Sequence, residues 1–336
     1  MNQTVTIAGS DIQFSCAPEQ SLLDAAAQAG IELPYSCRKG VCGNCAGRVL
    51  DGTVAGVAGA ALHNAACAPD QVLFCHATAL SPLVIAPQSW HRLDPDARKT
   101  LAVKVYRNDL LAPDVSLLQL RLPAGQRLRF RAGQYLQLHL DDSTTRSYSM
   151  ANAPHESDAV TLHIRHVPGG IASQRVPQLA KGDMLTITLP FGNFQLHDDG
   201  DRPMVCVAGG TGFAPIKSLL DDMVKRKIHR PVTLIWGARD DSGIYLMSAV
   251  ARWSKLLPQF HFVPAISHAS QSTLDGAHLG MVHEALAHHV DSLQEHDLYC
   301  CGSPAMVAAV RQTACQNLAL PPERFHADVF VPGGAG

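Results

Sequence analysis

The strongest constraint on this chain comes from four cysteines, three of which share one short loop. The four are Cys37, Cys42, Cys45 and Cys75. The first three have the spacing C-x4-C-x2-C and the fourth lies well downstream, which is the pattern of thiolates that hold a [2Fe–2S] cluster. Gly40 and Gly43 allow backbone amides of the loop to turn toward the sulfur atoms of such a group. The sequence therefore predicts a [2Fe–2S] cluster bound by these four thiols.

Two other uses of the cysteines, and one other choice of ligand, remain open. A Zn(Cys)4 site usually has two C-x2-C pairs, but only Cys42 and Cys45 form such a pair. A disulfide framework suits a short secreted chain, whereas these 10 cysteines lie in 336 residues for which we expect no secretory leader. Cys67 competes with Cys75 as the fourth ligand, but residues 72–75 read as a strand that directs Cys75 at the loop.

Length and composition indicate several globular domains. With 46% hydrophobic and 17% charged residues among 336, the chain can bury two or three cores. A formal net charge of −2 and the lack of Lys/Arg runs argue against nucleic acid as a partner. No apolar run approaches the roughly 20 residues of a spanning helix, so we expect no membrane partner. Unpaired thiols suit a reducing compartment, and we expect a cytoplasmic protein.

The first part of the chain has the element order of a β-grasp domain. Residues 2–15 alternate as a β-hairpin, and residues 21–30 form a short helix that Gly30 closes, just before the cysteine loop. We therefore expect a [2Fe–2S] domain of this fold over residues 1–90. Prolines and mixed charge without a sustained period predict a linker over residues 91–99.

The rest of the chain shows two further patterns. Short alternating segments with turn signals and little helical period fill residues 100–199, which predicts a small antiparallel β-barrel. The segments are 101–106, 115–122, 135–140, 160–167 and 184–189. From residue 200 to residue 336 strands alternate with helices, which predicts a doubly wound parallel sheet. The expected architecture is thus a β-grasp domain, an antiparallel barrel and an α/β domain.

A glycine-rich loop between a predicted strand and a predicted helix indicates a nucleotide site. The loop residues that we expect to contact the nucleotide are Gly209, Gly210, Thr211, Gly212 and Pro215. Glycines permit close approach of a pyrophosphate, and the start of the helix supplies amides and a positive dipole. The loop departs from the G-x-G-x-x-G pattern at Pro215, which suits the first turn of a helix. A tight turn without a ligand is the alternative.

Arg239 is the expected determinant of nucleotide choice. It follows the second predicted strand of the α/β domain, where the adenosine ribose lies in this kind of fold. An arginine there can pair with a 2′-phosphate. Asp240 and Asp241 follow directly and oppose a phosphate, so we expect NADPH to be accepted and leave the preference over NADH open.

Two motifs in the barrel region resemble the flavin site of the ferredoxin–NADP reductase superfamily. They are Arg146-Ser147-Tyr148-Ser149 and Pro168-Gly169-Gly170-Ile171-Ala172-Ser173. The resemblance implies bound FAD, with Arg146 on the diphosphate, Tyr148 stacked on the isoalloxazine and Ser149 at the flavin N5 edge. Further cofactor contacts that it implies come from Ser147, His163, Ile164, Arg165, Gly169, Gly170 and Ser173. Taken alone, Arg146 also fits a strand charge and Tyr148 a core aromatic.

The same resemblance assigns roles near the end of the chain. It places Cys301, followed by Gly302, beside the nicotinamide at the flavin, and it makes Phe330 the aromatic that covers the second flavin face. The expected catalytic residues are therefore Ser149, Cys301 and Phe330. A last core strand explains Phe330 nearly as well, since the chain continues to Gly336.

Over its whole length the chain resembles the reductase components of two-component aromatic-ring dioxygenases. Residues 33–40 and 146–152 carry the resemblance, and residues 154–158 and 325–330 narrow it within that family. The resemblance implies that NAD(P)H gives a hydride to FAD, that the flavin passes electrons singly to the [2Fe–2S] cluster, and that the cluster reduces the Rieske centre of an oxygenase. A two-electron donor is thereby matched to a one-electron acceptor.

The oxygenase partner is expected to be a separate polypeptide. A Rieske centre needs His and Cys ligand pairs, and no C-x-H motif occurs in the sequence. His283 and His288 have the spacing of mononuclear iron ligands, but Gly280 stands where an acid is required. A reductase for another hydroxylase or for a deoxysugar pathway is the alternative within this class. A non-catalytic metal-binding or redox-sensing protein is the alternative outside it.

Overall fold

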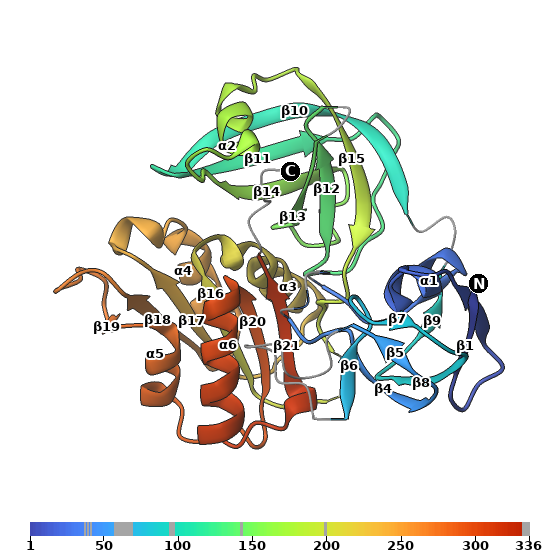
Figure 1. The fold of residues 1–336 in the computed structure, drawn as a ribbon. Coiled ribbons are helices and arrows are strands. Elements are labelled where there is room, and N and C mark those ends of the chain that lie inside the picture. Colours follow the sequence, from blue (N-terminus) through green and yellow to red (C-terminus); the bar gives the residue numbers. More distant parts are fainter. Residues whose placement is uncertain are drawn as a thin grey trace. The chain divides into compact units, whose positions relative to one another are not determined.

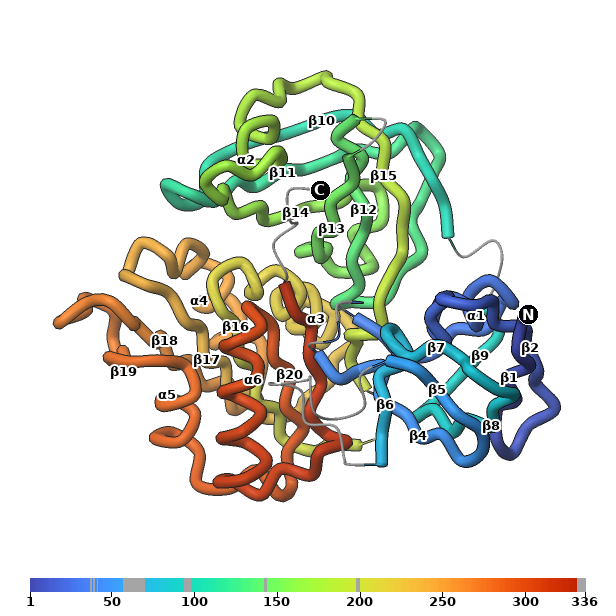
Figure 2. Tube along the Cα trace, viewed as in Figure 1, coloured from blue at the N-terminus to red at the C-terminus, as the bar shows by residue number. Residues whose placement is uncertain are grey.

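The computed structural model describes residues 1–36, 38, 40, 42–56, 70–93, 98–141, 144–197 and 200–330. The chain divides into two compact units, Met1–Ala97 and Arg98–Gly336 (Figures 1 and 2). The division falls inside the range 91–99 that the sequence assigns to a linker. Within the described ranges, no helix is both long enough and apolar enough to span a lipid bilayer.

The first unit is a β-grasp domain, as predicted. Its five-stranded sheet has the order β2-β1-β8-β4-β6, with β1 (Gln3–Ile7), β2 (Gln13–Cys16), β4 (Ala46–Asp51), β6 (Gln71–Leu73) and β8 (Leu83–Pro87). Helix α1 (Leu22–Gln28) begins at Ser21, whose hydroxyl accepts from the Asp24 amide, and the chain turns after it at Gly30 with a φ of +75°. The helix buries Leu22 and Leu23, so one apolar face stabilises the domain.

Two short strand pairs complete this unit, and one of them extends the domain beyond its expected end at residue 90. Strand β5 (Val54–Ala55) pairs with β7 (Thr78–Ala79), and β3 (Ile31–Glu32) pairs with β9 (His91–Arg92). Strand β9 lies inside the range expected to be linker. The His91 Nε2 to Glu32 Oε2 distance is 3.0 Å, and the Leu93 amide donates to the Gly30 carbonyl at 2.7 Å. Two residues are too few to show a period in the sequence, so the pattern could not reveal this strand.

The barrel begins the second unit. Its six strands are antiparallel in the order β13-β12-β15-β10-β11-β14, with β10 (Lys99–Ala112), β11 (Val115–Arg121), β12 (Tyr135–His139), β13 (Thr145–Ser149), β14 (Ala159–Arg165) and β15 (Met184–Phe191). The sheet closes where Met150 bridges Leu162 and the Ala151 amide donates to the Thr161 carbonyl at 2.8 Å. Strand β13 was not among the predicted segments, because its polar residues show no alternation. The short helix α2 (Ile171–Arg175) follows β14.

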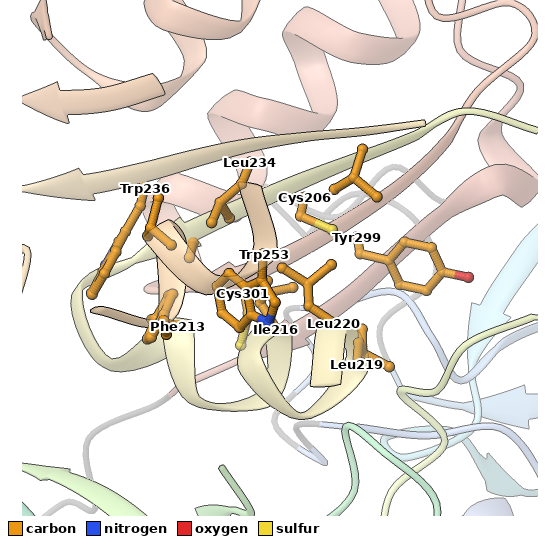
Figure 3. Packing of buried hydrophobic residues seen from close by; sticks show 14 of the residues in the cluster. Cys206, Phe213, Ile216, Leu219, Leu220, Leu234, Trp236, Trp253, Tyr299 and Cys301 are labelled. Carbon is orange, nitrogen blue, oxygen red and sulfur yellow. The ribbon is translucent and has the colours of Figure 1, made fainter. Parts of the chain in front are cut away.

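The α/β domain has the predicted parallel sheet, in the order β19-β18-β17-β16-β20-β21. Its strands are β16 (Met204–Gly209), β17 (Val232–Ala238), β18 (Phe260–Ile266), β19 (His278–Leu279), β20 (Asp297–Gly302) and β21 (Phe325–Val329). Its helices are α3 (Phe213–Arg226), α4 (Met247–Leu256), α5 (Val282–His289) and α6 (Pro304–Gln312). Figure 3 shows how Phe213, Ile216 and Leu220 of α3 pack beside Trp253 of α4 and the sheet residue Trp236. This core holds the start of α3 against the carboxyl end of β16.

The division after Ala97 gives the first expected result. A chain that begins at Arg98 should fold alone, retain FAD and be reduced by NAD(P)H, because the barrel and the α/β domain belong to one compact unit. Flavin absorbance after purification, followed by anaerobic titration with NADPH, checks this. A soluble fragment that has lost its flavin would show instead that the first unit completes the flavin site.

Candidate redox and nucleotide sites

Three of the four predicted cluster thiols lie in the described part of the first unit, and two of them, Cys45 and Cys75, are in contact. Cys42 and Cys45 are buried and Cys75 is half-buried. The Sγ atoms of Cys45 and Cys75 lie 3.2 Å apart, and the Asn44 amide donates to Cys42 Sγ at 3.5 Å. Cys75 follows the end of β6 rather than lying within the strand that the sequence suggested. Cys37, and the rival Cys67, lie outside the described residues.

Three described residues of the cysteine loop have a left-handed backbone conformation. Arg38, Gly40 and Gly43 have positive φ angles of +53°, +73° and +78°. A Cβ on Gly40 would come within 2.9 Å of the His76 ring, so this position also needs glycine for space. The Cys75 thiol and burial raise the pKa of Cys45 well above its usual value. A bound iron cation would favour the thiolate form and offset the repulsion between these two close sulfurs, so the contact is compatible with iron ligation.

Strand β13 presents the expected flavin residues at the closing edge of the barrel. Ser147 faces solvent, whereas Tyr148 is half-buried against the barrel core, and burial raises the pKa of Tyr148 to about 12. Arg146 Nη1 donates to the Thr145 carbonyl at 3.0 Å. Tyr148 therefore stays protonated and uncharged, and its half-buried ring can stack on another ring system.

Asp328 was not predicted from the sequence. The structure places it beside two of the three expected catalytic residues, Ser149 and Cys301. Ser149 Oγ donates to Asp328 Oδ2 at 3.1 Å across 179 residues of chain, and both side chains are buried. Asp328 on β21 is also the register partner of Cys301 on β20. Burial, Asp328 and Cys300 raise the pKa of Cys301 well above its usual value, which keeps the thiol protonated. The only sequence signal was the place of Asp328 two residues before Phe330.

The C-terminal aromatic lies directly after β21. The Phe330 amide donates to the Gly302 carbonyl at 2.9 Å, and its half-buried ring packs against the core of the α/β domain. Phe330 therefore lies beside β20, the strand that carries Cys301. This position agrees both with an aromatic that covers the flavin and with a last core residue. The residues after Phe330 lie outside the described part of the chain.

The three expected cofactor residues of β14 have different surroundings. Ile164 is fully buried in the barrel core, so only its backbone is available to a ligand. His163 Nδ1 lies 3.2 Å from Tyr245 Oη, while its buried Nε2 has no hydrogen-bond partner in the described residues. Burial, with Lys217 second, lowers the pKa of His163 to about 3, so the ring is neutral. Arg165 pairs with Asp114 and lies against the glycine-rich loop.

The turn before α2 has an open outer side. Gly169 has a φ of +77°, and a Cβ there would meet no heavy atom within 4 Å. The Gly170 amide donates to the Val167 carbonyl at 3.0 Å, and the Val167 amide donates to Ser173 Oγ at 2.6 Å. The Ser173 oxygen therefore holds the turn, while its proton remains available to a phosphate. This arrangement fits the role that the flavin resemblance assigns to the turn.

The glycine-rich loop joins β16 to α3 as predicted, and packing explains its glycines. Gly210 has a φ of +53°, and a Cβ there would lie 2.9 Å from the Arg165 guanidinium. A Cβ on Gly212 would overlap the backbone carbonyl of Cys301. The Trp236 indole donates to the Gly210 carbonyl at 3.0 Å, and Pro215 lies in the first turn of α3. The loop thus brings backbone amides, a helix start and one guanidinium to the same place, which suits a pyrophosphate.

At the end of β17 the carboxylates of the two acids beside Arg239 accept hydrogen bonds from nearby residues. Asp240 accepts hydrogen bonds from the Ser242 amide and hydroxyl. Asp241 accepts from the Ser272 hydroxyl and from the Thr273 amide and hydroxyl, and these bonds lower its pKa below the usual range. Arg239 itself is exposed, so its cation remains accessible to a ligand at the strand end.

Comparisons with known proteins agree with this geometry over the whole chain. Residues 5–80 match the family described as 2Fe-2S iron-sulfur cluster binding domain. Residues 102–196 match the oxidoreductase FAD-binding domain, and residues 206–312 match the oxidoreductase NAD-binding domain. The chain therefore contains an iron–sulfur, a flavin and a nicotinamide nucleotide domain in the predicted order.

Two relatives match this chain along its full length. The chain is 58% identical to terephthalate 1,2-dioxygenase, reductase component 2, of a Comamonas species and 56% identical to reductase component 1, in both cases over 100% of this chain and 99% of the relative. A solved cytochrome P450 reductase from Amycolatopsis is 30% identical, with a TM-score of 0.76 over 98% of this chain and 99% of that one. This chain belongs to the family of dioxygenase reductase components, and it is an NAD(P)H-dependent oxidoreductase that passes electrons through FAD and a [2Fe–2S] cluster to an oxygenase.

Proposed function

We propose that this protein is the reductase component of a terephthalate 1,2-dioxygenase and that its partner is a Rieske-type oxygenase. The observation that carries the proposal is the identity of 58% and 56% to two such reductase components along the full length of the chain. The structural support is that one chain contains converging cluster thiols, a flavin strand and a glycine-rich nucleotide loop.

The residues of β13 and its neighbours would hold the flavin. Arg146 would bind the diphosphate, and Tyr148 would stack on the ring system. Ser149 donates its hydrogen bond to Asp328, so its oxygen could accept a hydrogen bond from the N5–H of reduced flavin while the carboxylate fixes the hydroxyl. Gly169, Gly170 and Ser173 would hold phosphate. When bound, FAD supplies the conversion of a two-electron donor into single electrons.

The nucleotide would lie over the glycine-rich loop. Gly209, Gly210, Thr211 and Gly212 with the first turn of α3 would bind the pyrophosphate, and Arg165 would add a cation from the barrel side. Cys301 and Gly302 would face the nicotinamide. The Cys301 thiol is held protonated, so it can pack against the ring or donate a weak hydrogen bond but does not carry charge. Phe330 would cover the flavin until the nicotinamide arrives.

Reconstitution tests the proposal directly. The purified reductase should show both flavin and iron–sulfur absorption, and with NADPH it should support oxygen consumption and dihydroxylation of terephthalate by a terephthalate oxygenase. Oxygenases for other aromatic acids, and a deoxysugar dehydrase, serve as alternative acceptors. Faster turnover with one of these would reassign the partner, and a protein without flavin or cluster absorption would remove the electron-transfer function.

Arg239→Ala tests the adenosine end of the site. Loss of a charged hydrogen bond to a 2′-phosphate, worth ~1.5 kcal/mol, should raise KM for NADPH by about tenfold and leave KM for NADH nearly unchanged. Steady-state ferricyanide reduction with each nucleotide measures both constants. Arg226→Ala, an exposed arginine in the last turn of α3 that pairs with Asp222, is a matched control for loss of a cation. An equal change in KM for both nucleotides would place Arg239 away from the ribose.

A further inference from the structure

A buried ionic group on α3 lies outside the sites described above. Asp221 is 5% exposed and its carboxylate has three partners on two helices. Lys217 Nζ lies 2.8 Å away one turn earlier on α3, Trp253 Nε1 of α4 donates at 2.8 Å, and Arg252 completes the group. A buried carboxylate of this kind is stable only with its cations in place, so the group fixes the Lys217 side chain in one position.

Lys217 and its neighbour reach the flavin barrel. Lys217 Nζ donates to the Ala151 carbonyl at 3.0 Å, and the fully buried Ser218 hydroxyl donates to the Asn152 carbonyl at 2.7 Å. Ala151 and Asn152 lie two and three residues after the end of β13, the strand that presents Tyr148 and Ser149. Two adjacent residues of α3 thus donate hydrogen bonds to two adjacent backbone carbonyls that follow the flavin strand β13 in the chain.

The barrel side of this contact is itself rigid. The Asn152 amide group donates to the carbonyls of Glu156 and Ala159, at 3.0 and 3.1 Å, and its side-chain oxygen accepts from the Thr161 amide at 2.9 Å. The helix side is rigid because α3 packs on the sheet and on Trp253 (Figure 3). Movement between the flavin strand and the glycine-rich loop at the start of α3 therefore has to break this contact.

We propose that Lys217, Ser218 and Asp221 are positioning residues for hydride transfer, because they set the distance between the flavin strand and the nucleotide loop. In that step the C4–H bond of the nicotinamide breaks and an N5–H bond forms on the flavin, so the rate depends steeply on the separation of those atoms. The three residues touch neither the flavin residues of β13 nor the glycine-rich loop through a described side-chain contact. They act by holding the two surfaces that carry the reactants.

The test is the anaerobic stopped-flow reduction of the flavin by NADPH and by 4-deuterated NADPH. Lys217→Met keeps the length of the side chain and removes its hydrogen bonds to Ala151 and Asp221. The limiting rate should fall about 10- to 100-fold, as expected for misplaced reactants, with FAD content and the apparent Kd for NADPH unchanged and a larger isotope effect. Lys225→Met, on the exposed last turn of α3, is the matched control and should behave as wild type.

Two results would overturn the proposal. A folded Lys217→Met protein with a wild-type limiting rate, or one in which only the Kd for NADPH rises, would show that the group stabilises the fold or the nucleotide site without positioning the reactants. Ser218→Ala decides the case if Lys217→Met does not fold. It removes one hydroxyl and should lower the limiting rate in the same sense, whereas an unchanged rate in Ser218→Ala would refute the proposal.

Discussion

Cys75→Ser should abolish electron delivery to the oxygenase and leave reduction of the flavin intact. Serine offers iron a harder oxygen in place of a thiolate, so the [2Fe–2S] cluster should be lost or become labile. Cys75 lies 3.2 Å from Cys45 in the first unit, whereas the flavin and nucleotide residues belong to the second. NADPH-driven reduction of ferricyanide, which takes electrons from flavin directly, should therefore continue while oxygenase-coupled turnover falls to background.

Cys67→Ser is the control for this result, because Cys67 is the rival fourth ligand. It should retain the wild-type iron content and both activities. If Cys67→Ser lost its iron and Cys75→Ser kept it, the fourth ligand would be Cys67. If oxygenase turnover persisted in a protein without iron, electrons would not pass through the cluster at all.

Gly212→Ala should abolish reduction by NADPH, because the new Cβ would overlap the backbone carbonyl of Cys301. Backbone atoms cannot rotate away, so α3 and β20 would have to separate, at a cost of about 1–3 kcal/mol for overpacking. The same shift would displace the glycine-rich loop from Cys301 and Gly302. Flavin content should stay near wild type, since the flavin residues lie on the barrel.

The measurements for Gly212→Ala are the thermal midpoint and the rate of flavin reduction by NADPH. Gly200→Ala is a suitable comparison, because a Cβ there would meet the flexible Arg202 side chain at 3.3 Å and no positive φ is involved. It should resemble wild type. Wild-type kinetics in Gly212→Ala would mean that the contact between the loop and Cys301 does not shape the nucleotide site.

Features that depend on residues close together in the chain could be predicted from the sequence. The cysteine spacing predicted four ligands, and the structure brings one thiol of the loop, Cys45, into contact with the distant Cys75. The glycine-rich loop was equally local, since strand, glycines and helix follow each other in the chain. The barrel and the parallel sheet followed from the switch between alternating and helical patterns at residue 200.

Features that depend on distant segments could not be predicted from the sequence. Asp328 became a site residue only when β21 paired with β20 and brought its carboxylate to Ser149, 179 residues away. Strand β13 has too few apolar residues to show a period, although its Arg-Ser-Tyr-Ser motif could be assigned by resemblance. The Asp221 group looks like an ordinary charged helix face until α4 and the barrel cover it.

The most direct test of the central claim, that electrons pass from NAD(P)H through FAD to the [2Fe–2S] cluster, is to follow both centres in one anaerobic reaction with NADPH. Stopped-flow absorbance reports the flavin, and freeze-quench electron paramagnetic resonance reports the reduced cluster. The account predicts that the flavin bleaches first, that the cluster signal follows no faster, and that Cys75→Ser bleaches at the wild-type rate without a cluster signal. A cluster reduced before the flavin, or at the wild-type rate in a protein stripped of FAD, would contradict it.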